Sequence, residues 1–441
     1  MTIPSQKAST PGSPTSRNRF LKSIYNKIEA IPFRGIKNVS YLSVGNFVVE
    51  IINIVGFIYI ARMLGAQNYG IYVTVGTFVA MFEFILLEGL NKSIMREGSK
   101  DLTTMQVRLE NNIGIRNGLI LAAIGICIIS SFFAPYELQT RLYIILFSFQ
   151  LVHTGLVGFL GTIFQATEQM KYISLFGIFN RVLFVGSSIL FLYLGFGLLT
   201  LFLISLFSNL LTLLLNFRVS RKFVKFNLLA KIHVDKKILK PGIIFSLMTF
   251  VGFLTTRVDV LMISLLGTPA DVGVYGLAYR IAEQGVVLRN LIVTAFFPIF
   301  IKRFHSGTVR GGRLVRLSAL IFIAILSATF LASLFVKGLV VRVFGLQYEP
   351  SGRILEVLLF FLAFAWADML FTTAAQATHN EKYLLIIAAV MAVANVVLNY
   401  VFFLQFGLIG IAYSTLVVTF VGTMSEILVS YRVMKVQGHL V

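Results

Sequence analysis

Two neighbouring apolar stretches of the sequence contain side chains that can bind ions. Arg257 and Asp259 interrupt the first stretch, and Arg280, Glu283 and Gln284 interrupt the second. A planar guanidinium forms paired hydrogen bonds with phosphates or carboxylates, whereas a carboxylate can hold a proton or a metal cation. Because an ionised group is costly to insert into an apolar environment, these residues need partners, a ligand or water. They are therefore the first candidates for a binding site.

Helical spacing divides these residues into two groups. Arg280, Glu283 and Gln284 stand at positions i, i+3 and i+4, so they share one helix face and can pair locally. Cavity lining and a self-neutralised pair that only stabilises its own helix both fit this pattern, and we favour cavity lining. Arg257 and Asp259 are two residues apart, about 200° around a helix, and cannot form a simple local pair.

Asp259 and Arg257 therefore have different expected surroundings. Asp259 shares its face with Gly252, Thr255 and Thr256, which predicts that this face lines a polar interior. Arg257 lies on the opposite, apolar face and must reach a partner on another helix. A structural salt bridge between helices and contact with a ligand are both compatible with Arg257.

Polar stripes at helical spacing occur in four other apolar segments. Three of them contain a charged residue, namely Glu50, Arg181 or Asp368, and we include these three as candidates. The alternative is that small and amide side chains on such faces only bring helices together. The stripes consist of Asn46, Glu50 and Asn53; Ser174, Arg181 and Ser188; Asp368, Thr372 and Gln376; and Asn395 and Asn399.

The sequence contains no catalytic or metal-binding constellation. Its histidines show no metal-ligand spacing, and it has no Gly-Lys-Ser/Thr loop for phosphate binding. Cys127 is the only cysteine, which excludes an internal disulfide framework and a thiolate metal site. We therefore expect no enzymatic activity, no resident cofactor and no direct use of ATP. The histidines are His153, His233, His305, His379 and His439.

The elements that position the candidate residues are membrane-spanning helices. Of the 441 residues, 57% are hydrophobic and only 13% are charged, whereas about a quarter of the residues in soluble domains are charged. A span needs about 20 predominantly apolar residues, which predicts an all-α polytopic membrane protein with about twelve helices. The predicted helices cover residues 40–63, 70–92, 113–134, 141–166, 172–194, 198–218, 241–266, 273–301, 314–336, 354–378, 383–404 and 407–431.

The formal net charge of +20 is better explained by membrane topology than by nucleic-acid binding. With the amino terminus inside, the outer segments contain only Arg62, Arg141, Lys337, Arg342 and Arg353. Four arginines fall within spans: Arg181, Arg257, Arg280 and Arg289. The other basic residues, Arg116 among them, are assigned to inner segments. This asymmetry predicts a multi-pass protein of the cytoplasmic (plasma) membrane with both termini in the cytoplasm.

Three short motifs recur in the same order at a near-constant offset, which indicates an internal repeat. They are LGAQNYGIY (64–72) and LGTPADVGVY (266–275), QATEQMKY (165–172) and QATHNEKY (376–383), and FGL at 196–198 and 406–408. Because six helices fall in each half, the repeat predicts two lobes related by a pseudo-twofold axis along the membrane normal. That arrangement is typical of transporters that rock two lobes about a central site.

The predicted domain boundaries follow from the spans and the charges. They define a disordered basic cytoplasmic tail (1–37), an amino-terminal lobe (38–218), a basic cytoplasmic inter-lobe loop (219–240), a carboxy-terminal lobe (241–432) and a cytoplasmic tail (433–441). The loop is interpreted as a hinge between the lobes. A basic segment that lies on anionic lipid headgroups is equally compatible, so membrane lipids are expected partners.

These motifs, with GLNKSIMREGSK (89–100), RVDVLMISLLGTPADVGVYGLAYRIAE (257–283) and FPIFIKRF (297–304), resemble one family of membrane proteins. It comprises the polysaccharide transporters, or O-antigen and oligosaccharide flippases, of the multidrug/oligosaccharidyl-lipid/polysaccharide export superfamily. The resemblance implies two lobes around a cavity that opens alternately to each side, and a polyprenyl-diphosphate-linked glycan as cargo. It also implies that cationic cavity residues receive the diphosphate, and Arg257 and Arg280 occupy the matching positions.

The site residues expected from this resemblance form two sets. The substrate-binding candidates are Arg257, Arg280, Arg181 and Gln284, and the candidates for coupling or ion pairing are Asp259, Glu283, Glu50 and Asp368. A coupling proton or sodium ion is expected at the second set, and a glycan polymerase or glycosyltransferases are expected partners. Within the predicted spans the acids match or outnumber the arginines, so the sequence does not indicate an evidently cationic cavity.

Two other functions are compatible with parts of the pattern. A multidrug or organic-cation antiporter of the same superfamily is permitted by the acidic residues within the spans. A membrane glycan polymerase or ligase is disfavoured, because such enzymes need substantial outer loops for their catalytic groups. The outer connections near Gly195, Gly267 and Gln405 are only a few residues long.

Overall fold

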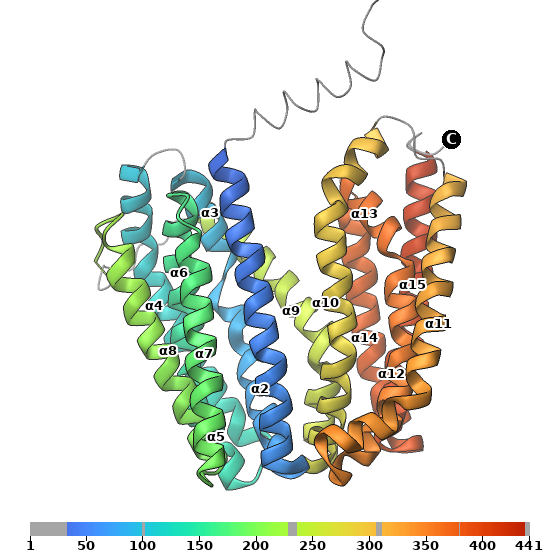
Figure 1. Ribbon diagram of the computed structural model, residues 1–441. Coiled ribbons are helices and arrows are strands. Elements are labelled where there is room, and N and C mark those ends of the chain that lie inside the picture. The colour runs from blue at the N-terminus through green and yellow to red at the C-terminus, as the bar shows by residue number, and fades with distance from the viewer. Residues whose placement is uncertain (1–32, 99–101, 228–235, 306–310, 379, 437–441) are drawn as a thin grey trace, which may run out of the picture.

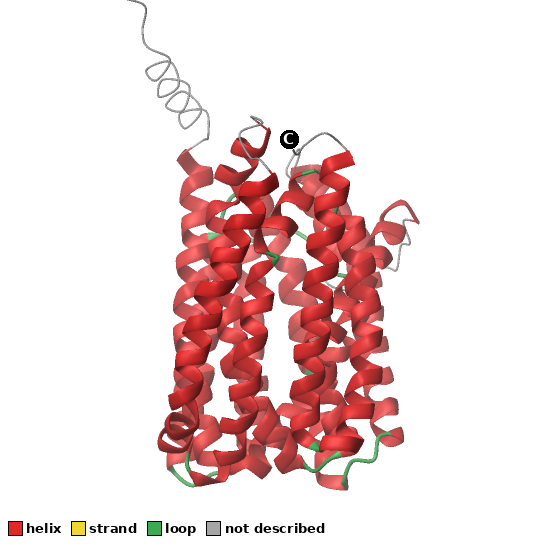
Figure 2. Ribbon diagram, turned by 90° about the vertical axis from the view of Figure 1, so that its right-hand side faces the viewer, coloured by secondary structure: helices red, strands yellow, loops and turns green. Residues whose placement is uncertain are grey.

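The computed structural model describes residues 33–98, 102–227, 236–305, 311–378 and 380–436, and within these ranges the chain forms helices and no strand. Figure 1 shows two helical bundles side by side. Figure 2 shows that the helices run roughly parallel and that loops join them at the two ends. A helix satisfies its backbone hydrogen bonds internally, as a membrane requires. The predicted all-α, two-lobe architecture is confirmed.

The lobes follow one another along the chain. The amino-terminal lobe consists of α2 (Phe33–Ala80), the 3-10 helix η1 (Met81–Leu86), α3 (Gly89–Gly98), α4 (Leu102–Phe133), α5 (Leu138–Phe147), α6 (Gln150–Ala166), α7 (Lys171–Tyr193) and α8 (Leu198–Ser220). The carboxy-terminal lobe consists of α9 (Lys236–Leu266), α10 (Pro269–His305), α11 (Gly311–Phe344), η2 (Leu346–Tyr348), α12 (Glu349–Ala367), α13 (Met369–Ala377), α14 (Glu381–Phe406) and α15 (Leu408–Val436). Helix α9 contacts both α3 and α14, so it lies between the lobes. We call the end where α2 begins and α15 ends the terminal end, and the opposite end the distal end.

Ten helical stretches of the described residues are long and apolar enough to cross a membrane. Most of the predicted spans 40–63 and 70–92 falls in one of them, Tyr41–Leu86, because α2 continues through a kink at Gly65, whose φ of 74° is readily available to glycine. The predicted span 273–301 lies in α10, which is not among the ten. A total of twelve spans therefore stays a prediction.

Two predicted spans are interrupted beside ionisable residues. Helices α12 and α13 meet at Asp368, while η1 and Leu87, whose φ is 49°, separate α2 from α3. Arg116 on α4 donates hydrogen bonds to the Leu86 carbonyl oxygen at 2.6 Å and to Asn91 Oδ1 at 2.5 Å. Arg116 is only 1% exposed. Its assignment to an inner-side segment is therefore wrong: its guanidinium satisfies a carbonyl that the broken helix leaves free.

The two copies of the first repeat motif meet at the distal end of the lobe interface. Gly70 on α2 and Gly273 on α10 hold equivalent positions in the motif, and the helices cross so closely that a methyl group on Gly273 would lie 1.9 Å from the Ala66 carbonyl oxygen. The Tyr348 hydroxyl donates to the Ala61 carbonyl at 2.8 Å. Towards the terminal end, α2 and α10 diverge (Figure 1). The lobes are thus closed against each other at the distal end, while the pseudo-twofold relation stays a prediction.

The helix ends shift the predicted domain boundaries. Residues 33–37 of the predicted tail lie in α2, and residues 236–240 of the predicted loop lie in α9. In the described part of the loop, Val224 and Phe226 are buried and belong to a cluster of the amino-terminal lobe against which Phe217 packs. Residues 1–32, 228–235 and 437–441 lie outside the described residues, so the predictions for the two tails and for the rest of the loop are untested.

Candidate functional site

A cavity of about 530 Å³ lies between the two lobes and is lined by side chains from α2 and from α5 to α10. Tyr69 and Gly276 line it next to the α2–α10 crossing. Phe57, Phe147 and Phe253 are among its apolar lining residues. Its polar lining residues are Asn53, Tyr69, Tyr72, Thr77, Gln150, His153, Asn180, Arg181, Ser205, Ser208, Asn209, Arg257, Tyr279 and Arg280.

Three arginines give this cavity a positive charge. Arg181 comes from α7, Arg257 from α9 and Arg280 from α10, so both lobes contribute. Among the described residues that line the cavity, none is Asp or Glu. This corrects the expectation of a cavity that is not evidently cationic: the numbers of acids and arginines in the spans are similar, but the helix packing turns most of the acids away.

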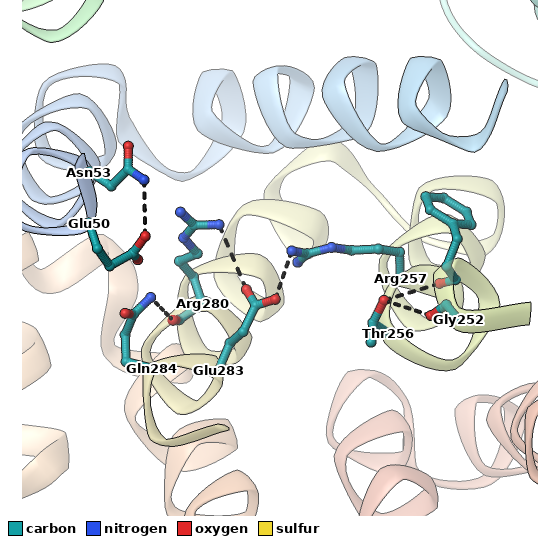
Figure 3. Close-up of polar contacts among 9 residues, drawn as sticks. Glu50, Asn53, Gly252, Thr256, Arg257, Arg280, Glu283 and Gln284 are labelled. Atoms are coloured by element: carbon teal, nitrogen blue, oxygen red, sulfur yellow. Dashed lines mark hydrogen bonds and ion pairs between the residues drawn. The ribbon is translucent and has the colours of Figure 1, made fainter. Parts of the chain in front are cut away.

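Glu283 on α10 lies between two of these arginines. Its Oε1 is 2.8 Å from Nη2 of Arg257 and its Oε2 is 3.7 Å from Nη1 of Arg280. Figure 3 shows the Glu283 carboxylate flanked by the two guanidinium groups. The structure thus confirms that Arg257 reaches a partner on another helix and that Arg280 and Glu283 pair locally. The side chains of Arg257 and Arg280 remain 31% and 34% exposed, so both can also contact a ligand.

Arg181 has no carboxylate within ion-pair distance in the described part of the chain. Its guanidinium lies 5.8 Å from the centre of the Phe184 ring, which is within the range of a cation–π contact. The neighbouring Asn180 donates to Asn209 and to Thr212 on α8, each at 3.1 Å. Arg181 is therefore a fixed positive charge of the amino-terminal lobe that a ligand is free to neutralise.

Asp259 lies apart from the cavity, inside the carboxy-terminal lobe. It is 3% exposed, and its carboxylate accepts hydrogen bonds from four side chains on α10, α14 and α15. Thr255 and Thr256 are exposed and donate to carbonyls of their own helix. The prediction that they share a polar interior with Asp259 is therefore wrong. The four donors are Tyr275 at 2.7 Å, Asn395 at 2.9 Å, Asn399 at 2.7 Å and Thr415 at 2.8 Å.

The other three candidates occupy separate positions. Asp368 forms an ion pair with Arg289 inside the carboxy-terminal lobe and does not line the cavity. Glu50 accepts a hydrogen bond of 3.1 Å from Asn53. Asn53 lines the cavity, whereas Glu50 does not. Gln284 lines a smaller neighbouring pocket together with Arg280. The structure therefore gathers Arg181, Arg257, Arg280 and Glu283, with Gln284 adjacent. It places Asp259, Glu50 and Asp368 outside the cavity lining.

Several residues of these sites were missed from the sequence. Asn180 and Asn209 line the cavity, and Tyr275 and Thr415 bind Asp259. Two of them carried a usable signal, because Asn180 adjoins Arg181 and Tyr275 ends the second copy of the repeat motif. Asn209 and Thr415 are polar residues in apolar helices with no charged neighbour in sequence, so only packing reveals their roles.

Comparisons with known proteins agree with this architecture. A family model described as polysaccharide biosynthesis protein matches residues 36–304. No curated protein matches the chain significantly. Among solved structures, the lipid II flippase MurJ in an inward closed conformation aligns with a TM-score of 0.71 and 16% identity, over 89% of this chain and 87% of that one.

Two structures of multidrug resistance MATE family transporters of the MOP superfamily also align. An inward-facing conformation has a TM-score of 0.71 and 16% identity, over 91% of this chain and 98% of that one. An outward-facing conformation has a TM-score of 0.59 and 17% identity, over 91% and 96%. At these identities the likeness shows the fold alone.

Proposed function

We propose that this chain, which belongs to the polysaccharide biosynthesis protein family, moves a polyprenyl-diphosphate-linked oligosaccharide or polysaccharide repeat unit across the membrane by alternating access. The observation that carries the proposal is a cavity between two lobes whose charged lining residues, among those described, are three arginines. The fold shared with the lipid II flippase MurJ and with MATE transporters supports transport. The proposal requires no catalytic step.

The charge of the cavity suits a diphosphate. Arg181, Arg257 and Arg280 supply three positive charges, and the adjacent Glu283 removes one, which leaves two. The diphosphate that joins a glycan to its lipid carrier is doubly charged. A planar guanidinium binds phosphate oxygens through paired hydrogen bonds. The arginines come from both lobes, so a bound diphosphate would connect the two bodies that must move relative to each other.

Without substrate, the Glu283 carboxylate would bind the guanidinium groups that a substrate phosphate binds later. In the absence of a ligand it keeps the guanidinium groups of Arg257 and Arg280 close together, which lowers their mutual repulsion. A phosphate group that enters between them competes with this carboxylate for the same donors. Glu283 therefore favours release of the substrate as well as the alignment of its binding site.

The end at which the lobes are closed determines the side of the membrane from which the substrate would be loaded. The lobes are closed against each other at the distal end. The terminal end carries most of the basic residues and is expected to face the cytoplasm. In this conformation the chain would load its substrate from the inner leaflet. Separation at the distal end would then release the substrate on the outer side of the plasma membrane.

We further propose that Asp259 is the site where a driving proton or sodium ion binds. Asp259 comes from α9, which contacts both lobes, and its four donors come from α10, α14 and α15. Hydroxyl and amide groups can turn their oxygens towards a cation, so the same cluster can coordinate a sodium ion. Binding there would change the packing of α9 against the rest of its lobe, and thereby the opening of the cavity.

The alternative, an organic-cation antiporter, fits the cavity less well. Three arginine side chains repel a cationic ligand, and within the described lining no carboxylate is present to offset them. A glycan polymerase or glycosyltransferases, as suppliers or users of the substrate, remain proposed partners that follow from the family and not from a described surface.

The proposal is tested in a strain that lacks the gene. We expect lipid-linked glycan to accumulate on the inner leaflet, the normal chain to reverse this, and Arg257→Ala or Arg280→Ala to fail at equal membrane abundance. Arg353→Ala is the matched control, because Arg353 is 63% exposed, pairs with Glu349 and does not line the cavity. Normal outer-leaflet glycan in the deletion strain would contradict the proposal. Ethidium efflux that depends on the chain would favour the antiporter.

A further inference from the structure

Helix α8 presents a stripe of polar side chains to the central cavity. Ser205, Ser208, Asn209 and Thr212 stand at positions i, i+3, i+4 and i+7, so they share one face of the helix. The first three line the cavity, whereas Thr212 is buried and does not line it. Helix α8 packs on α5, α6 and α7, so the stripe belongs to the amino-terminal lobe. This wall of the cavity is therefore polar and, within the stripe, uncharged.

Asn180 on α7 fixes the orientation of two amide groups in this wall. Its Nδ2 donates to Oδ1 of Asn209 and to Oγ1 of Thr212, each at 3.1 Å. An asparagine amide has two N–H groups, so both of those of Asn180 are used. Among the described residues, no hydrogen bond engages the other atoms of the pair, Oδ1 of Asn180 and Nδ2 of Asn209. Both residues line the cavity, so an acceptor and a pair of donors are available there to a ligand.

Burial makes the amide of Asn209 a suitable binding group. Asn209 is 9% exposed, so its amide has little access to water. A polar group that leaves water without a partner is costly, and a ligand acceptor would remove that cost. The bond that joins Asn209 to Asn180 uses only the Oδ1 atom of Asn209. The Nδ2 group is thus not needed for the contact between α7 and α8 and is available for recognition.

The neighbouring lining residues suit a carbohydrate. Gln150 and His153 on α6 add further polar groups to the cavity. Tyr72 on α2 and Phe147 on α5 contribute aromatic rings, whose centres lie 5.8 Å and 5.2 Å from that of Phe202. A sugar ring carries hydroxyl or acetamido groups at its edge and C–H groups on its faces, so a site that combines aromatic rings with a few placed polar groups matches it. The wall therefore fits an uncharged sugar better than an aliphatic chain.

We infer that Asn180 and Asn209 bind the sugar that is attached directly to the diphosphate, through its uncharged hydroxyl or acetamido groups. Asn180 directly precedes Arg181, which the proposed function assigns to the diphosphate, and both residues line the cavity. A sugar joined to a diphosphate at Arg181 is therefore within reach of the two amides. The inference rests on the proposed function and adds to it the residues that recognise the glycan. These residues belong to one lobe, whereas the arginines that receive the diphosphate come from both.

The test compares carriers with and without a sugar on the full-length chain in detergent, by titration in native mass spectrometry. The probes are a bare polyprenyl diphosphate and the same carrier linked to N-acetylglucosamine or to glucose. Asn209→Leu removes the amide, and Asn209→Ala is a smaller second substitution at the same position. Asn216→Leu is the matched control, because Asn216 lies on the same helix, is 3% exposed and does not line the cavity.

We expect the normal chain to bind at least one sugar-linked probe about fivefold to tenfold more tightly than the bare carrier, as one or two neutral hydrogen bonds would produce. Asn209→Leu and Asn209→Ala should lose most of this preference, while their affinity for the bare carrier stays within about twofold of the normal value. Asn216→Leu should keep the preference.

A preference that both Asn209 variants retain, or that Asn216→Leu loses equally, would overturn the inference and leave the proposed function intact. Equal weakening of all three probes by the Asn209 variants would show that Asn209 acts only through helix packing, which also overturns the inference. Equal binding of the three probes by the normal chain would overturn it as well. A normal chain that binds none of the probes would contradict the proposed function, and the inference would fall with it.

Discussion

Replacing Gly273 with alanine is expected to open the distal end of the lobe interface. Gly273 on α10 faces Gly70 on α2 where the two helices cross, and the added methyl group would lie 1.9 Å from the carbonyl oxygen of Ala66. Ordinary van der Waals contacts of such a carbon begin at 3.4 Å. Since the obstacle is backbone and not a flexible side chain, the two helices must move apart.

The required displacement sets the size of the effect. The difference between 3.4 Å and 1.9 Å means that α2 and α10 must separate locally by about 1.5 Å. Overpacking of this kind costs about 1–3 kcal/mol. Because about 1.4 kcal/mol changes an equilibrium tenfold, the distally closed state should lose roughly 5-fold to 150-fold in population relative to states with separated lobes.

The assay is labelling of a single cysteine from outside the cell with a membrane-impermeant maleimide. Cys127 is buried and is first replaced with alanine, and a cysteine is then placed at Val73, which lines the cavity. We expect Gly273→Ala to raise the labelling rate at Val73→Cys at least about fivefold. Gly338→Ala on α11 is the matched control, because its added methyl group would meet no atom within 4 Å.

Two outcomes of the labelling experiment would contradict different parts of this prediction. If Gly273→Ala folds and labels at the rate of the parent, the crossing does not close the distal end and the packing argument is refuted. If labelling rises only in inside-out vesicles, the packing argument holds and the predicted orientation of the chain is wrong.

Three further predictions address individual residues. Arg181→Ala should weaken binding of polyprenyl diphosphate about 10-fold to 100-fold, because a charged hydrogen bond contributes about 1.5–3 kcal/mol. Arg181→Lys should lose less affinity. Equal affinity of the normal chain and Arg181→Ala in a binding titration would contradict a role of Arg181 in substrate binding. Asp259→Asn should abolish the dependence of transport in proteoliposomes on a proton or sodium gradient while substrate affinity stays within about twofold; a preserved gradient dependence would exclude Asp259 as the coupling site. Arg116→Met should lower the free energy of unfolding by about 2 kcal/mol or more, because the Leu86 carbonyl and Asn91 lose a buried charged donor. The measurement is the midpoint of thermal unfolding in detergent, which should fall. An unchanged midpoint would show that the break after η1 does not depend on Arg116.

Composition, the internal repeat and close spacing along one helix gave predictions that the structure confirms. The apolar composition predicted a helical membrane protein, because a backbone in lipid must satisfy its own hydrogen bonds. The repeat predicted two lobes, and its equivalent glycines, Gly70 and Gly273, do meet across the lobe interface. The pair between Arg280 and Glu283 followed from a spacing of three residues on one helix. Each of these inferences needs only local geometry or composition.

Orientation around a helix axis could not be predicted in the same way. Asp259 shares a helical face with Thr255 and Thr256, yet Asp259 is buried among donors from α10, α14 and α15, whereas the two threonines are exposed. A helix of 31 residues enters different surroundings along its length. Asp259 lies only about one turn beyond the two threonines, so the surroundings of a single face of α9 change between neighbouring turns.

The sequence by itself predicted, except for Arg116, which ionisable residues lie within apolar helices, because their cost in an apolar run shows without any knowledge of the fold. Only the tertiary structure decided which of them share a cavity. It brings Arg181, Arg257 and Arg280 to one space, directs Asp259 and Asp368 into the carboxy-terminal lobe, and encloses Arg116 beside a broken helix. The physical reason is that burial of a charge requires partners, and partners from distant helices are positioned by the packing of the whole chain.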